Sequence, residues 1–237
     1  MKKGGLTERV KDRIEQVRQR MAEAAHRVGR DPDEIALVAV TKTVPIPRIR
    51  EAIDVGVMLL GENRVQEASD KMALLSSLPV TWHLIGHLQT NKSRSAAELF
   101  GLIHSLDSVK LAVALDRHGA ALAKQIRVLV EVNLGGEPSK TGVLEHDLVP
   151  LLESCRQFTH LVIEGLMAVP PFRRNPEDVR PFFRRLRLLR DEAARACPDC
   201  PLRHLSMGMS HDYEIAIEEG ATLVRIGTAI FDERPVI

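Results

Sequence analysis

Short apolar runs and segments of helical spacing alternate along most of the chain. Segments with apolar residues three and four positions apart predict helices at 47–55, 64–75, 91–99, 108–124, 145–157, 177–196 and 212–219. Between them, eight apolar runs have the length and composition of strands, at residues 35–41, 57–60, 82–86, 102–106, 127–134, 161–169, 203–207 and 222–226. Strands separated by helices are typical of a parallel sheet with crossover connections.

The length of the chain favours closing these strands into a ring. With 237 residues, the chain matches a (β/α)8 (TIM) barrel, for which ~250 residues are typical; an open doubly wound sheet is the alternative. Residues 6–28 predict an extra N-terminal helix that ends at Gly29 and packs on the barrel. Because no linker or low-complexity tract interrupts the pattern, we expect residues 1–237 to form a single domain.

Composition narrows the functional classes. The chain is 44% hydrophobic and 27% charged with a net charge of +1, so nothing indicates binding to nucleic acid or to an anionic membrane. No apolar run reaches the ~20 residues of a bilayer span, and the N-terminus lacks the apolar core of a signal peptide. A cytoplasmic location is therefore expected. Three cysteines argue against a disulfide framework, and without a second ligand pair we expect no metal site.

An arginine-rich segment, residues 173–190, could suggest a nucleic-acid surface. Phe183, Leu186 and Leu189 fall at helical spacing within it, however, and predict one buried stripe. The arginines then lie on the opposite face, which is the usual solvated side of an amphipathic helix.

Lys42 closes the first predicted strand. A lysine at the dry end of a strand must find a partner, reach water or lose its proton. An amine that loses its proton attacks aldehydes and forms a Schiff base. Polar and glycine residues also gather where the other strands end, the face at which barrel active sites lie. Turns favour such residues too, but Lys42 and Arg225 are not typical turn residues.

The last two strands end in segments suited to holding a phosphate, Ser206–Ser210 and Gly227–Thr228. Barrels often bind phosphate with the loops after strands 7 and 8. Closure pairs strand 8 with strand 1 at ~4.8 Å, so Lys42 should stand beside this phosphate-binding segment, with Arg225 on the same face as Gly227. An amine next to a phosphate site predicts an aldehyde that carries a phosphate. Two structural alternatives stay open: Ser210 capping the helix that starts near residue 211, and Arg225 in an ion pair.

With these residues in view, the chain resembles the pyridoxal 5′-phosphate (PLP) homeostasis proteins, relatives of the alanine racemase N-terminal barrel (fold type III). The segments that carry the resemblance are 37–43, 61–67, 82–92, 132–133, 139–142, 165–170, 205–210 and 224–231. The resemblance implies that Lys42 holds PLP as a Schiff base and that Arg225 faces the pyridine nitrogen. It also implies a phosphate site and a ring pocket, formed by Ser206, Gly208, Gly227 and Thr228, and by Asn63, His83 and Met167, respectively. Asp232 stands where the family usually has glycine, and we expect its carboxylate to point away from the phosphate.

The same resemblance bears on catalysis. An arginine cannot give up its proton to the ring nitrogen, so the nitrogen stays neutral and PLP is a weaker electron sink. Related racemases take a catalytic tyrosine from a second domain, and this chain has no length left for one. The single tyrosine here, Tyr213, falls in the helix after strand 7 and is expected to pack.

We therefore expect a monomeric, cytoplasmic PLP-binding protein that buffers PLP or delivers it to PLP-dependent apoenzymes, not a high-turnover enzyme. Such a protein would act in vitamin B6 homeostasis and so affect amino-acid metabolism. One alternative is a single-domain PLP-dependent amino-acid racemase. Another is a Schiff-base aldolase acting on sugar phosphates, disfavoured because the sixth strand, which often holds the lysine in such barrels, has none.

Overall fold

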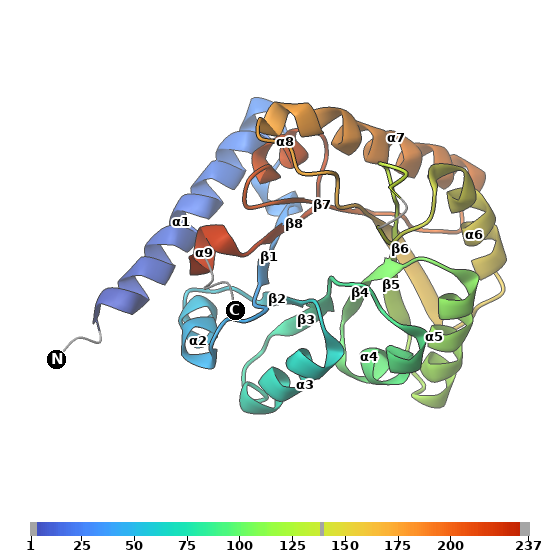
Figure 1. The fold of residues 1–237 in the computed structure, drawn as a ribbon, viewed down its shortest axis with the longest axis horizontal. Coiled ribbons are helices and arrows are strands. Elements are labelled where there is room, and N and C mark those ends of the chain that lie inside the picture. The colour runs from blue at the N-terminus through green and yellow to red at the C-terminus, as the bar shows by residue number, and fades with distance from the viewer. Residues whose placement is uncertain (1–3, 138–139, 233–237) are drawn as a thin grey trace.

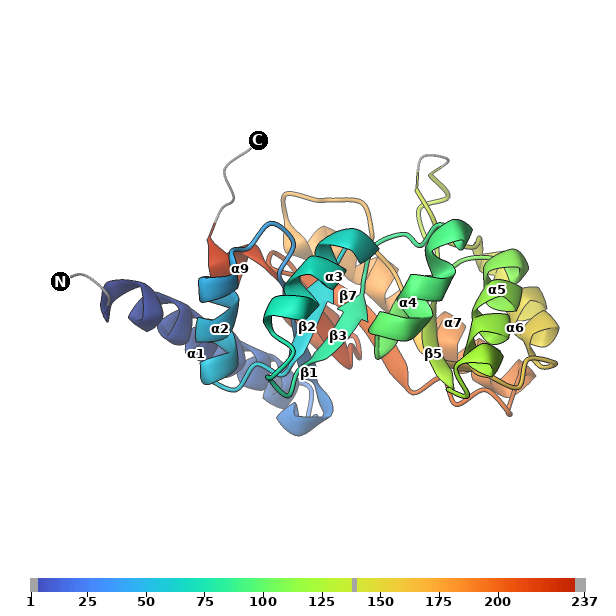
Figure 2. The same cartoon turned by 90° about the horizontal axis from the view of Figure 1, so that it is seen from below.

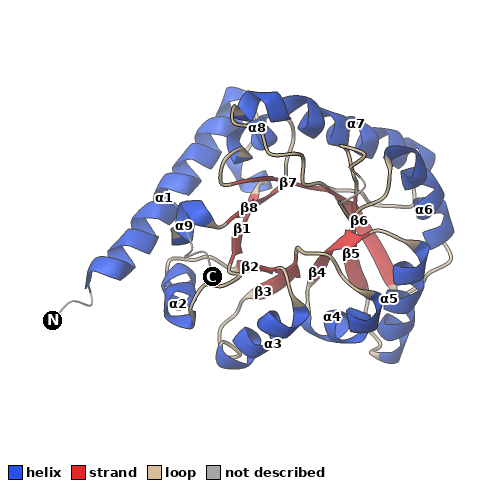
Figure 3. Cartoon of the chain, viewed as in Figure 1, coloured by secondary structure: helices blue, strands red, loops and turns tan. Residues whose placement is uncertain are grey.

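Eight parallel strands close into a barrel in the computed structural model, which describes residues 4–137 and 140–232. Each strand pairs with the next, and the last pairs with the first (Figures 1 and 3). The predicted barrel is confirmed, and the open doubly wound alternative is wrong. The strands are β1 (Ala36–Val40), β2 (Leu59–Glu62), β3 (Thr81–Leu84), β4 (Leu102–Leu106), β5 (Ile126–Glu131), β6 (Leu161–Met167), β7 (His204–Met209) and β8 (Leu223–Ile226).

Helices surround the ring of strands (Figure 3). No helix in the described ranges is both long and apolar enough to cross a membrane. One helix after β8 was not predicted, and α7 starts later than expected because Pro181 occupies its first turn. The helices are α1 (Gly4–Arg27), α2 (Ile46–Asp54), α3 (Val65–Leu74), α4 (Ser93–Leu99), α5 (Val109–Ala121), α6 (Leu148–Cys155), α7 (Arg180–Ala196), α8 (Tyr213–Glu218) and α9 (Thr228–Phe231).

The extra N-terminal helix lies outside the ring, against α2, α8 and α9 (Figure 1). Val10, Ile14, Val17 and Met21 form its apolar stripe and are all buried. The stripe therefore packs on the helices that flank the first and last strands, in agreement with the packing that its helical spacing predicted.

Closure of the barrel places the first strand, β1, next to the last strand, β8. Val38 on β1 pairs with Arg225 on β8, and Ala39 pairs with Ile226. The loops after β1 and β8 therefore leave the barrel at the same end and next to each other, as expected from the sequence. Figure 2 shows the barrel from the side, with this end of the strands uppermost.

A bulge interrupts the pairing of β7 with β8. Ser206 pairs with Leu223 and Met209 with Arg225, so three steps along β7 match two along β8. Gly208 lies inside the bulge with φ +90°, a left-handed conformation that glycine adopts readily. The bulge changes which side chains of β7 face the interior.

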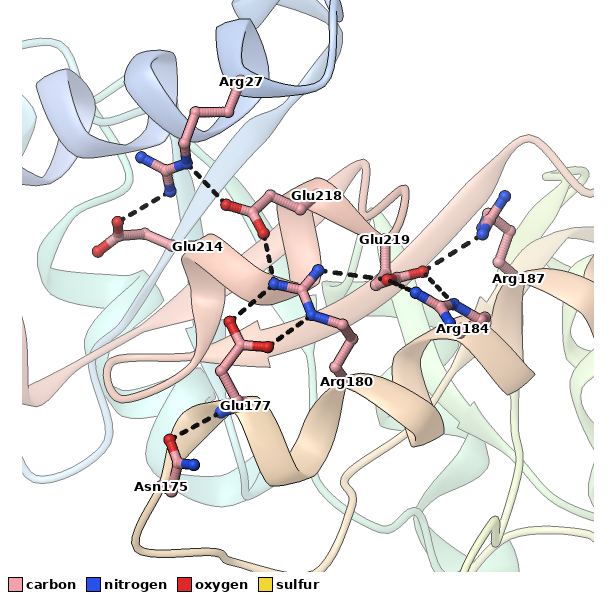
Figure 4. Close-up of polar contacts among 9 residues, drawn as sticks. All are labelled: Arg27, Asn175, Glu177, Arg180, Arg184, Arg187, Glu214, Glu218 and Glu219. Carbon is pink, nitrogen blue, oxygen red and sulfur yellow. Dashed lines mark hydrogen bonds and ion pairs between the residues drawn. The ribbon is translucent and has the colours of Figure 1, made fainter.

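The arginine-rich segment forms an ion-pair network on the outside of the barrel. Phe183, Leu186 and Leu189 are buried, so the predicted stripe is confirmed. Its arginines from Arg180 onward are nevertheless paired with carboxylates, several of them with Glu218 and Glu219 at the end of α8 (Figure 4). Glu219 is the centre of this network: it accepts hydrogen bonds from three guanidinium groups, those of Arg184, Arg180 and Arg187.

Candidate functional site

A cavity of about 380 Å³ opens at the carboxyl end of the strands. It brings together residues from both ends of the chain, because it lies where β8 meets β1. Its lining includes an amine, a guanidinium, hydroxyl groups and apolar side chains: Val40, Lys42, Asn63, Ile85, Val169, Met209, Ser210, His211, Arg225, Gly227 and Thr228. Five of the sequence-predicted site residues are in this list: Lys42, Asn63, Arg225, Gly227 and Thr228.

Lys42 lies in the turn that follows β1. Val44 N donates to Thr41 O (2.9 Å) and closes the turn. Thr43, its third residue, has φ +60°, a conformation that is unusual for a β-branched residue. Strand alternation turns Val38, Val40 and then Lys42 toward the barrel interior, so the half-buried Lys42 reaches the cavity.

The start of α9 forms one end of the cavity. Gly227 N and Ala229 N both point at Ser210 Oγ, at 3.3 and 3.2 Å. Thr228, between them, is exposed. The alternative in which Ser210 caps the helix that follows it is wrong: α8 begins after Asp212 without a side-chain cap, and Ser210 accepts from the start of α9 instead. Backbone amides and two hydroxyl groups thus converge at this end.

Ser206 and Gly208 were also expected to contact a phosphate, but neither lines the cavity. Ser206 is fully buried below it. At Gly208 an added Cβ would stand 2.5 Å from Ala216 Cβ, so this glycine faces α8 and permits its close packing. The bulge in β7 brings Met209 and Ser210 to the cavity in their place.

Arg225 forms part of the cavity floor and is only 4% exposed. Its Nη1 donates to Ser206 Oγ (2.5 Å) and its Nη2 to Ala168 O (2.9 Å). Burial lowers its pKa to about 10, while Asp212 and Glu131 act in the opposite direction. The guanidinium therefore stays protonated at neutral pH. The ion-pair alternative is not supported among the described residues, where no carboxylate is within ion-pair distance of Arg225 and both Asp212 and Glu131 act on it only at longer range.

A chain of hydrogen bonds continues from Arg225 across the barrel. Ser206 Oγ lies 2.9 Å from His104 Nδ1, and His104 Nε2 lies 3.0 Å from His83 Nδ1. Burial lowers the pKa of His83 to about 4 and that of His104 well below its usual value, so both rings are neutral at pH 7. Neutral rings allow two patterns along this chain: Ser206 donates to His104 and His104 to His83, or His83 donates to His104 and His104 to Ser206.

His83 and Met167 belong to this buried layer and not to the cavity lining. Met167 packs in the barrel interior with Val38, Leu102 and Leu223. His104 was not among the predicted site residues. Its inward position on the strand next to that of His83 was the signal that could have paired the two rings.

Other candidate groups lie outside the cavity. Tyr213 is buried below the Arg20 guanidinium, whose carbon is 5.8 Å from the ring centre. The carboxylate of Asp232 turns away to Arg13 and Arg48, as expected. Ser139, which belongs to one matching segment, lies outside the described residues.

No metal or thiol site accompanies the cavity within the described part of the chain. No cluster of three or more histidine, cysteine or acidic side chains there could hold a metal. Cys155, Cys197 and Cys200 are free thiols, and burial raises the pKa of each. They lie at or after the carboxyl ends of α6 and α7, away from the cavity, and their raised pKa values disfavour the reactive thiolate form.

Comparison with known proteins agrees with this arrangement. The family model described as the N-terminal domain of alanine racemase matches residues 11–235. An alanine racemase from Streptomyces coelicolor has the same fold, with a TM-score of 0.69 and 18% identity, over 97% of this chain and 59% of that one. The barrel with a lysine after its first strand is thus of the alanine racemase N-terminal class.

Closer relatives define the family. A pyridoxal phosphate homeostasis protein from Aquifex aeolicus is 47% identical over 94% of this chain and 97% of its own. PipY from Synechococcus elongatus PCC7942, whose structure was solved with PLP bound, is 37% identical with a TM-score of 0.84, over 94% of this chain and 99% of its own. The chain belongs to the family of pyridoxal phosphate homeostasis proteins, and the resemblance seen in the sequence is confirmed.

Proposed function

We propose that this protein binds pyridoxal 5′-phosphate covalently through Lys42 and serves to hold and supply the cofactor inside the cell. One observation carries the proposal: the Lys42 amine, the Arg225 guanidinium and the converging donors around Ser210 line one cavity of about 380 Å³. That volume is at the small end of the range for ligand pockets, roughly 300–1,000 Å³. The PLP bound to PipY, a relative with the same fold, supports the assignment.

The residues present fit the three chemical parts of PLP. Lys42 provides the amine for the aldehyde, and the protonated Arg225 provides a donor for the pyridine nitrogen. Ser210, Gly227 and Thr228 provide hydroxyl and amide donors for the phosphate. Asn63 lies on the cavity wall and is assigned to the ring edge. Ser206, His83 and Met167 act from below by supporting Arg225 and filling the interior, and Gly208 acts by shaping the bulge.

A holding role follows from the chemistry of this set. When bound, PLP supplies an electrophilic aldehyde and a ring that can accept electrons. Arg225, with a pKa of about 10, keeps its proton at neutral pH, so it would donate a hydrogen bond to the ring nitrogen of bound PLP without protonating it. Among the described residues that line the cavity there is no tyrosine. The homeostasis name of the relatives is consistent with this role.

The wider parts of the proposal follow from the same role. A cofactor reservoir needs recipients, so we include transfer of PLP to PLP-dependent apoenzymes. We also propose that the chain acts as a monomer, as one barrel domain over residues 1–237, in the cytoplasm. Its three free thiols are typical of that reducing compartment.

Spectra of the purified protein and of Lys42→Ala test the proposal. The wild type should show the visible absorbance of lysine-bound PLP, and Lys42→Ala should lose it while still folding. Addition of amino acids in deuterated water tests the holding role. Exchange of the α-proton at enzyme-like rates would favour a racemase instead, and a wild-type protein that takes up no PLP would refute cofactor binding.

A further inference from the structure

Three charged side chains lie behind the turn that carries Lys42. Glu62 ends β2, and Glu67 and Lys71 lie on α3, so they occupy the layer between the barrel wall and the helices. Lys71 Nζ is 2.7 Å from Glu62 Oε1 and 2.7 Å from Glu67 Oε1. Lys71 is only 9% exposed and Glu62 is fully buried. We name Glu62, Glu67 and Lys71 the brace.

The brace holds the turn on both sides of Lys42. On one side, Lys71 Nζ donates to Thr41 O (2.6 Å), and Thr41 Oγ1 donates to Glu62 Oε1 (2.6 Å). On the other side, Thr43 N donates to Glu67 Oε1 (2.6 Å). The three protons of the Lys71 ammonium thus meet three acceptors. The backbone on either side of Lys42 is fixed from outside the barrel, while its side chain extends to the inside.

The turn needs such support because its conformation is unfavourable. Thr43 has φ +60° at the third position of a four-residue turn, where glycine is the usual residue. A residue in this region persists only when its surroundings hold it there. The hydrogen bond from Thr43 N to Glu67 is the contact that does so on the brace side.

The brace is also costly to bury. Replacing a buried ion pair by apolar residues is often neutral or stabilising, so packing alone does not explain it. Burial raises the pKa of Glu62, in spite of its bonds to Lys71 and Thr41. Its second oxygen, Oε2, is buried without a hydrogen-bond partner among the described residues. A group kept at such a cost, with its contacts on residues 41 and 43, points to a positional role.

We propose that Lys71, together with Glu67 and Glu62, is a positioning device that sets the conformation of the turn and so presents the Lys42 amine to the cavity. This inference rests on the proposed function, because it assigns the brace to the capture of PLP by Lys42. It assigns a role in PLP binding to residues that do not line the cavity. The brace also links the turn after β1 to the segment after β2, where Asn63 reaches the same cavity.

The chain offers a matched control for Lys71. Lys124 is also partly buried and also donates to backbone carbonyls, those of Ala97 (2.9 Å) and Phe100 (3.3 Å). It lies between α5 and β5, away from the cavity. Lys71→Met and Lys124→Met should therefore both lower the melting temperature, but only Lys71→Met should impair the binding of PLP.

Two measurements distinguish a role of Lys71 in positioning Lys42 from a general effect on the stability of the protein. The first is the affinity of the apoprotein for PLP, together with the amount of PLP fixed to Lys42 by borohydride. Both should fall about tenfold to a hundredfold in Lys71→Met, because displacing a reacting group by about 1 Å has effects of that size, and both should stay at the wild-type level in Lys124→Met. The second readout needs no PLP: the Thr43 amide, in an exposed residue, should be protected from hydrogen exchange in the wild type and in Lys124→Met.

A second variant covers the case in which Lys71→Met does not fold. Glu67→Ala removes the partly exposed member of the brace, so it should fold, lose the protection of the Thr43 amide and bind PLP several-fold more weakly. Wild-type affinity in Glu67→Ala or in folded Lys71→Met would overturn the positioning role. If the wild type itself takes up no PLP while its Thr43 amide is protected, the proposed function fails and the structural brace does not.

Discussion

Ser206 is the single hydroxyl that joins Arg225 to the two buried histidines. It accepts from Arg225 Nη1 (2.5 Å) and lies 2.9 Å from His104 Nδ1. The Ser206→Ala variant leaves both groups in place and removes their common partner. Ser105 is the matched control: it is also fully buried, but its hydroxyl has no partner among the described residues.

The two serine variants should change the free energy of unfolding by different amounts and in opposite directions. A buried group left without its hydrogen bond costs about 1–3 kcal/mol, and more when it is charged. Ser206→Ala leaves one neutral ring and one guanidinium, so we expect the free energy of unfolding to fall by about 2–5 kcal/mol. Ser105→Ala removes a hydroxyl that gains nothing from burial, so the same quantity should be unchanged or rise by up to about 1 kcal/mol.

Thermal and urea unfolding of the apoproteins check this difference. For a chain of this size, about 1 kcal/mol corresponds to roughly 2–4 °C, so Ser206→Ala should melt about 4–20 °C lower. PLP affinity should fall in this variant as well, because Arg225 loses one of its two fixed contacts. If the two serine variants are equally stable, the hydrogen-bond chain from Arg225 to His83 does not contribute to stability as the geometry indicates.

Three further predictions concern pH, salt and backbone strain. The pKa of His83 is about 4 in the folded protein and ~6.5 in the unfolded chain, so the unfolded state takes up a proton first as the pH falls. The contribution of His83 to the free energy of unfolding should therefore be at its maximum above pH 6.5 and fall by roughly 3 kcal/mol toward pH 4. Urea unfolding across this range should show the loss, and His83→Gln should reduce it. Glu219→Ala should destabilise the protein more at low salt than at high salt, since its arginine partners are partly exposed. The control Glu192→Ala removes a more exposed ion pair and should have little effect on stability at either salt concentration. Equal losses of stability in the two variants would contradict the role of the network. Asp232 has φ 70° and ψ 169°, a region almost restricted to glycine. Asp232→Gly should therefore be more stable than Asp232→Ala by about 1 kcal/mol, and the reverse order in thermal unfolding would rule out strain at this position.

The ring of strands and the place of the cavity were predictable from the sequence, because both depend on periodicity. Apolar runs fixed the strands to within a few residues, and closure then required the segment after β8 to lie beside Lys42. Arg225 followed from strand alternation with Gly227. These steps use only the backbone geometry of a closed parallel barrel.

The side chains of β7 could not be placed in the same way. Alternation assumes a regular strand, and the bulge adds one residue between Ser206 and Met209. A bulge depends on tertiary packing, here the close contact of Gly208 with α8. The expectation that Ser206 and Gly208 line the phosphate end was wrong because it assumed regular alternation across a bulge that the sequence does not reveal.

The brace was missed for a different reason, although a signal was present. Ala68, Lys71 and Leu75 fall on the buried side of the helix after β2, so a lysine stands where periodicity requires an apolar residue. A charged residue on a buried stripe needs a buried partner. Glu62, directly after a buried glycine, was the candidate, but only coordinates show that the pair reaches the turn around Lys42.

The distribution of buried polar groups argues for the same site. Most of the buried polar residues in the described barrel wall and interior form two sets: Thr41, Glu62 and Lys71 behind the turn, and His83, His104, Ser206 and Arg225 below the cavity; Ser105 and Glu131 on the strands belong to neither set. Each group costs free energy to bury, and an apolar interior would be a more stable choice. Both sets contact segments that line one cavity, the first from outside the barrel and the second from inside. Departures from local stability rules that converge on one place are the mark of a functional site, and here they converge on Lys42 and Arg225.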